Sequence, residues 1–130
     1  MKMVLSLLSG LIGVALIVFG CYAMVATTIV TDMTALVPKG VAGLNEARAI
    51  YAGSFWAMGG LILYGLGSPR FRQPFLLSIG LIFGGFIVAR IISIAMDGYD
   101  PSLGAAIGAE LVATLILIAA SRASSPVSSV

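Results

Sequence analysis

The sequence contains no histidine and a single cysteine, Cys21. Without histidine, the chain lacks the most common general base and a usual side-chain ligand of zinc and haem iron. One cysteine cannot form a disulfide within the chain or build a cysteine metal cluster. The sequence therefore predicts no metal site and no cofactor, and identifies no catalytic residue. These absences weigh against an enzyme without excluding one.

Charged residues are also scarce, at 9% of the 130 residues, whereas hydrophobic residues make up 60%. A soluble domain carries about a quarter charged residues, so this composition excludes a soluble fold. The net charge of +2 comes from scattered side chains, without the basic run that favours nucleic-acid binding. We expect the lipid bilayer to surround the chain and no nucleic acid to bind it.

Four apolar stretches have the length of about 20 residues that a helix needs to cross a bilayer. They lie at about residues 3–26, 47–67, 75–96 and 103–120, with turn-forming residues between them. We predict an all-α fold, an integral membrane bundle of four transmembrane helices that forms one domain over residues 1–122. A disordered tail is predicted over residues 123–130. A secretory signal peptide is the alternative for the first stretch, but the apolar run continues beyond Cys21 without a polar linker.

The positions of the loop cations predict the orientation, because cytoplasmic loops carry the excess of lysine and arginine. Lys2, Arg70, Arg72 and Arg122 fall on one side of the predicted bundle, and Lys39 is the clear loop cation on the other side. We therefore predict that both termini are cytoplasmic.

Small residues recur at every fourth position in the spans, and in lipid such rows mark close helix contacts. We expect these rows to hold one bundle together, with a homodimer contact as the alternative. The rows are Ser9 and Gly13 in the first span, Ala49, Gly53, Ala57 and Gly60 in the second, Gly80 and Gly84 in the third, and Gly104 and Gly108 in the fourth.

Two ionisable residues, Arg90 and Glu110, lie inside predicted spans, where an unpaired charge is costly. At a rise of 1.5 Å per residue, both lie about 10 Å below the outer boundary. The third and fourth spans are joined by a tight turn and must be antiparallel neighbours. The sequence therefore predicts an ion pair between them.

Other polar side chains gather towards the same outer face: Glu46, Arg48 and Tyr51 at the start of the second span, and Asp97 at the end of the third. We predict a polar pocket there with Arg90 and Glu110 at its floor, binding a small lipophilic or anionic ligand. The alternative is that the ion pair only fixes helix register.

The segment Asn45–Gly53 (NEARAIYAG), followed by Arg90 and the turn Asp97–Pro101 (DGYDP), resembles a family of small bacterial four-helix membrane proteins, the domain of unknown function 4345. In that family the tyrosine is often followed by two glycines, whereas Ala52 and then Gly53 follow Tyr51 here. The resemblance implies a multi-pass protein of a bacterial-type cytoplasmic (inner) membrane and a distantly DoxX-like form, but no reaction. The motif positions that it implies are Glu46, Arg48, Tyr51, Gly53, Arg90, Asp97 and Gly98.

Three functions follow as hypotheses. The first is a binding or accessory component that holds a ligand in the outer pocket or docks on a larger membrane complex. The second is a homodimeric small-molecule or proton-coupled transporter, although the first span has no acidic residue of the kind that small four-span exporters use. The third is a membrane enzyme that modifies a lipid or a quinone, for which no nucleophile motif is present.

Overall fold

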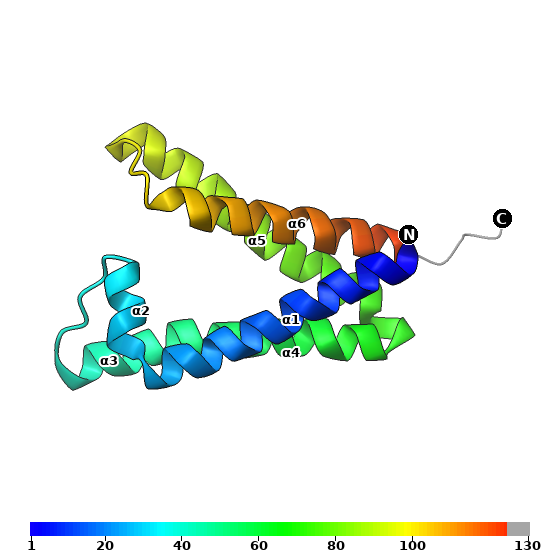
Figure 1. Ribbon diagram of the computed structural model, residues 1–130, viewed down its shortest axis with the longest axis horizontal. Helices are drawn as coiled ribbons and strands as arrows, with labels where there is room; N and C mark the ends of the chain where they lie inside the picture. The colour runs from blue at the N-terminus through cyan, green and yellow to red at the C-terminus, as the bar shows by residue number, and fades with distance from the viewer. Residues whose placement is uncertain (125–130) are drawn as a thin grey trace.

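The computed structural model describes residues 1–124, and all regular secondary structure in this range is helical (Figure 1). The elements are α1 (Lys2–Val25), α2 (Thr27–Met33), α3 (Gly40–Arg48), the π-helix η1 (Ala49–Gly53), α4 (Ser54–Gly67), α5 (Pro69–Asp97) and α6 (Leu103–Ser124). Helices α3, η1 and α4 run on as one helix, Gly40–Gly67. This helix, α1, α5 and α6 are each long and apolar enough to cross a membrane. The predicted all-α fold with four membrane spans is confirmed.

Some helix boundaries differ from the predicted spans. Helix α5 begins at Pro69, a favourable first position for proline. Pro74 therefore lies inside this helix, where it removes one backbone hydrogen bond near the start without ending the helix. Helix α6 continues to Ser124, so residues 123 and 124 of the predicted tail are helical. The remainder of that predicted tail, residues 125–130, lies outside the described residues.

The four spans form a ring in which α1 packs on α4, α4 on α5, α5 on α6 and α6 on α1. The pairs α1/α4 and α5/α6 are close together near the N-terminus and diverge towards α2 and α3 (Figure 1). We call these the closed end and the open end of the bundle. Lys2 and Ser124 line one small cavity at the closed end, so the two ends of the described chain lie on the same side. That this side is cytoplasmic stays a prediction.

The apolar core fills the closed half of the bundle. Its largest members, Ile62, Leu76, Ile79 and Leu117, are at most 2% exposed. A second, smaller cluster of Ala23, Val30 and Ala52 lies where α2 folds back on α1 and η1. By contrast, no residue from 84 to 112 is buried, so the last turns of α5 and the first turns of α6 have no core between them and the α1/α4 pair.

Close helix contacts occur at some glycines and not at others. A Cβ at Gly59 would lie 2.6 Å from the carbonyl oxygen of Gly13, and a Cβ at Gly80 would lie 3.0 Å from Ile118. The predicted contact rows of the first and third spans therefore do pack inside the bundle. The prediction is wrong for the rows of the second and fourth spans, because a Cβ would meet open space at Gly53, Gly60 and Gly108.

Candidate functional site

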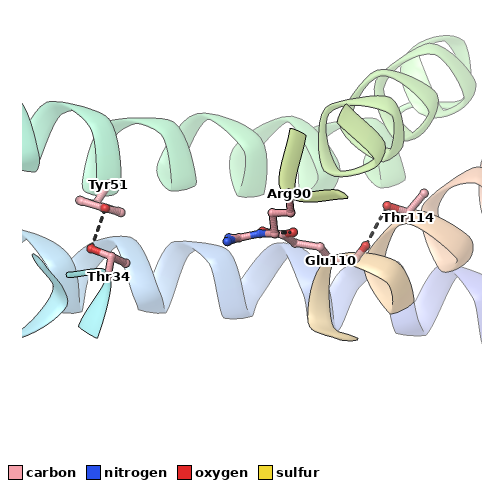
Figure 2. A network of polar contacts seen from close by, with 5 residues as sticks. All are labelled: Thr34, Tyr51, Arg90, Glu110 and Thr114. Atoms are coloured by element: carbon pink, nitrogen blue, oxygen red, sulfur yellow. Dashed lines mark hydrogen bonds and ion pairs between the residues drawn. The ribbon is translucent and has the colours of Figure 1, made fainter. Parts of the chain in front are cut away.

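Arg90 of α5 and Glu110 of α6 form a bidentate ion pair (Figure 2). The Arg90 Nε donates to Oε2 of Glu110 at 2.8 Å, and Nη2 donates to Oε1 at 2.8 Å. This arrangement of two parallel charge-assisted hydrogen bonds is the strongest geometry for such a pair. The ion pair predicted from the sequence is present, and it is the only one among residues 1–124.

The turn between α5 and α6 brings these two side chains to the same depth. Gly98 adopts a φ of +95°, which glycine accommodates without strain and which ends α5. Asp100 then accepts a hydrogen bond from the backbone N–H of Ser102 at 2.8 Å, just before α6 begins. Hydrogen bonds from the side chain and the backbone of Ser102 lower the pKa of Asp100. The short turn makes the helices antiparallel, so residues that lie the same number of positions before and after the turn come to the same depth.

Tyr51 lies across from the ion pair, on the side of the α1/α4 pair. Its hydroxyl oxygen is 2.9 Å from the hydroxyl oxygen of Thr34 (Figure 2). Tyr51 belongs to η1, the π-helical turn inside the second span. Such turns carry one extra residue relative to an α-helix and are frequent at functional sites. Thr34 follows α2 directly, in a polar segment without periodicity, so the sequence offered no signal for its role.

Two cavities adjoin the ion pair, with volumes of 340 and 490 Å³. They share four lining residues, Tyr51, Phe55, Arg90 and Glu110, and we call the two together the cleft. The smaller cavity extends between α4 and α5, and the larger one extends between α1 and α6. Apart from the shared residues, Ser54 and Thr34 are the polar side chains in the walls. The cleft is therefore apolar, with its polar groups concentrated at one place.

Arg48, a predicted pocket residue, lines neither cavity of the cleft. Its Nε donates to the carbonyl oxygen of Met24 at 3.3 Å and to Oγ1 of Thr27 at 3.1 Å. These groups lie at the break between α1 and α2, where the last carbonyl groups of α1 lack helical partners. The structure therefore places Arg48 at a helix end, where it ties the second span to the first.

Glu46 and Asp97 also lie away from the ion pair. Glu46 is exposed and lines a separate cavity of 210 Å³ beneath the segment after α2, where Tyr51 forms part of the wall. Asp97 is exposed at the end of α5 and accepts a hydrogen bond from Oγ of Ser93 at 3.4 Å. Of the six residues predicted to line one pocket, only Tyr51, Arg90 and Glu110 come together in the cleft.

The chemistry available in the cleft is hydrogen bonding to a bound molecule. Among residues 1–124, no three histidine, cysteine, aspartate or glutamate side chains lie close enough to hold a metal ion. Glu110 is the only carboxylate in the walls, and both its oxygens already accept from Arg90. The donors of Arg90 that have no acceptor within the described chain are the two N–H groups on Nη1 and the second N–H group on Nη2. The hydroxyl groups of Tyr51 and Thr34 bond to each other, and Thr34 Oγ1 also donates to the carbonyl oxygens of Val30 and Thr31.

Comparison with known proteins gives one match. The sequence model of the family described as a domain of unknown function (DUF4345) matches residues 4–121, a range that includes all four spans and the motif segments of the second and third. No curated protein and no solved structure matches the chain. The likeness to the DoxX type thus stays a prediction. Because the match covers nearly the whole described chain, this membrane protein belongs to the DUF4345 family.

Proposed function

We propose that this protein is a membrane binding protein that holds a lipophilic ligand in the cleft. The ligand's head group would lie at Arg90, Glu110 and Tyr51, and its apolar part would lie along the α1, α5 and α6 walls. The observation that carries the proposal is the composition of the cleft. An apolar pocket of a few hundred Å³ with a few convergent polar groups is typical of small-molecule sites.

The charge of the ion pair favours a neutral head group with hydrogen-bond acceptors. Glu110 already neutralises Arg90, so an anionic head group would bring a net negative charge into apolar surroundings, at a cost in desolvation. A carbonyl or ether oxygen needs no counter-charge. It can accept from Nη1 of Arg90 while the ion pair stays intact.

The closed half of the bundle favours binding over transport. The core between the cleft and the closed end consists of apolar side chains such as Ile62, Leu76 and Leu117. No Asp, Glu, Lys or Arg lies between residues 111 and 121 of α6, or between residues 73 and 89 of α5. A proton or a polar solute would find no ionisable side chain to carry it along these helices past the cleft.

The test compares binding of two probes to the purified full chain in mild detergent: a short-chain alkyl benzoquinone, which is neutral and has carbonyl acceptors, and an alkanoate of the same chain length. Native mass spectrometry reads the bound fraction during a titration. We expect saturable, one-to-one binding of the quinone and weaker binding of the alkanoate. Tyr51→Phe should weaken quinone binding by at most about threefold, because the Tyr51 hydroxyl already bonds to Thr34 and would exchange one hydrogen bond for another.

A matched pair of variants locates the probe. Ala109 and Ala105 lie one turn apart on the same helix and are both exposed, but Ala109 lines the larger cavity and Ala105 lines neither. Ala109→Phe fills the cavity and should abolish saturable binding, and Ala105→Phe should bind the quinone as the wild type does. Equal binding by these two variants would overturn the cleft as the site. Tighter binding of the alkanoate would overturn the neutral head group.

A further inference from the structure

A second, separate cavity lies at the closed end of the bundle, far along the spans from the cleft. It has a volume of 190 Å³ and lies between the starts of α1 and α5 and the end of α6. Two cations, Lys2 and Arg72, and two hydroxyl groups, from Ser6 and Ser124, are among its lining side chains. The Ser124 hydroxyl already donates to the carbonyl oxygen of Ala120, so within the described chain Ser6 supplies the free hydroxyl. The wall therefore holds positive charge and hydrogen-bond donors, in contrast to the apolar wall of the cleft.

The positive charge at this end is not compensated by acidic side chains. The five acidic residues are Asp32, Glu46, Asp97, Asp100 and Glu110, which lie at the open end or in the cleft. The only ion pair among residues 1–124 is the one in the cleft. Lys2 and Arg72 share the closed end with Arg70 and Arg122, so an anion that approaches this end meets an uncompensated positive potential.

Arg72 is fixed in place with part of its donor set unused. Its Nη2 donates to the carbonyl oxygen of Leu66 in the last turn of α4, which holds the guanidinium beside the helix end. Its Nε is buried and has no hydrogen-bond partner among the described residues. A buried charged donor without an acceptor is unfavourable, so negative charge near this guanidinium would be stabilising.

We propose that this cavity binds a phosphate group, supplied by the head group of an anionic phospholipid in the adjoining leaflet. Lys2 and Arg72 lie at the starts of the first and third spans, which is the depth at which lipid phosphates lie. Basic pockets between transmembrane helices recognise anionic head groups through such contacts. Phosphate oxygens accept from ammonium, guanidinium and hydroxyl donors, the three kinds that line this cavity. This site is independent of the ligand proposed for the cleft.

The test is a native mass spectrometry titration of the purified full chain in mild detergent with phosphatidylglycerol, phosphatidylcholine and inorganic phosphate. We expect phosphatidylglycerol to bind more tightly than phosphatidylcholine, whose phosphate carries its own counter-charge. Lys2→Gln and Arg72→Gln should each weaken phosphatidylglycerol binding by about tenfold or more, the effect of one lost hydrogen bond between charged groups.

Arg70→Gln is the matched control, because Arg70 is exposed, lies over the ring of Phe71 and does not line the cavity. It should weaken binding by less than about twofold, because salt screens an exposed charge that makes no contact with the bound head group. Arg72→Gln also loses the bond to Leu66, so its helical content and melting temperature are checked. Lys2→Gln makes the same test without that loss, since Lys2 has no side-chain hydrogen bond within the described chain.

Three results would overturn parts of the proposal. Equal weakening by Arg70→Gln and by Lys2→Gln would mean a diffuse basic belt instead of a site. Equal affinity of the wild type for the two lipids would remove the selection for an anionic head group. If inorganic phosphate binds and neither lipid does, with the same dependence on Lys2 and Arg72, the cavity is a phosphate site. The proposal that a lipid supplies the phosphate would then be wrong.

Discussion

Replacing Glu110 by glutamine leaves the Arg90 guanidinium inside the membrane without a counter-charge. Removing one partner of a fully buried ion pair costs about 3–5 kcal/mol. The two side chains are 33% and 12% exposed, so contact with the cleft reduces that cost. We expect Glu110→Gln to lower the free energy of unfolding by about 2–3 kcal/mol.

The opposite replacement is expected to cost less. Arg90→Leu leaves a carboxyl group, which can become neutral by taking up a proton, whereas a guanidinium cannot lose its charge. We expect a loss of about 1–2 kcal/mol for this variant. The double variant Arg90→Leu/Glu110→Leu removes both charges together and should lie within about 1 kcal/mol of the wild type, because two apolar side chains replace the pair.

The assay is reversible unfolding of the three variants and the wild type in mixed micelles, by titration with a denaturing detergent and circular dichroism of the helices. The four free energies separate the cost of one unpaired charge, which each single variant carries, from the cost of replacing both charges together. A double variant as unstable as Glu110→Gln would refute the reasoning. So would a Glu110→Gln variant as stable as the wild type, since the guanidinium would then need no partner.

Two further predictions concern a glycine pair and a turn. Gly59→Ala should destabilise the bundle by about 1–3 kcal/mol, because the added methyl group meets the backbone of α1, whereas Gly60→Ala faces open space and should be neutral or stabilising by up to about 1 kcal/mol. Equal effects in the same unfolding assay would contradict the packing. The pKa of Asp100, measured by NMR titration, should lie below its ordinary value because of its hydrogen bonds from Ser102. The contribution of this turn to stability is then present at neutral pH and is lost as the pH falls through that lowered pKa. Ser102→Ala, which removes the side-chain hydrogen bond, should return the pKa of Asp100 towards its ordinary value.

The spans and the ion pair could be predicted because they depend on features that are local in the sequence. Span lengths follow from apolar runs, and a tight turn such as the one at Gly98 forces its two helices into antiparallel contact. Residues at equal distance from that turn then meet, so counting was enough to pair Arg90 with Glu110. The resemblance to the family could be recognised because its two motif segments, Asn45–Gly53 and Asp97–Pro101, are each short and continuous in the chain, and the family match over residues 4–121 confirms it.

Contacts between distant segments could not be predicted from the sequence. The pairing of Arg48 with the end of α1 depends on how the chain returns through α2 to the start of the second span, in a stretch without apolar periodicity. The outward direction of Gly53 and Gly60 depends on the rotation of a helix about its axis, which small-residue spacing alone does not fix. For the same reason Glu46 and Arg48, which the sequence grouped with Tyr51, lie outside the cleft.

The π-helical turn η1 divides the second span into two parts, α3 and α4. The positions that tolerate substitution should recur at helical spacing within each part, but the two series should not be continuous with each other. Each α-helical residue advances about 100° around the axis, so one extra residue in η1 offsets the faces of α3 and α4 by that amount. Deleting a single residue within Ala49–Gly53 would restore an uninterrupted helix and rotate Glu46 and Arg48 away from their places while α4 kept its packing. The effect of substitutions along this span therefore depends on two short helices whose buried faces are offset. A single periodic pattern would not describe it.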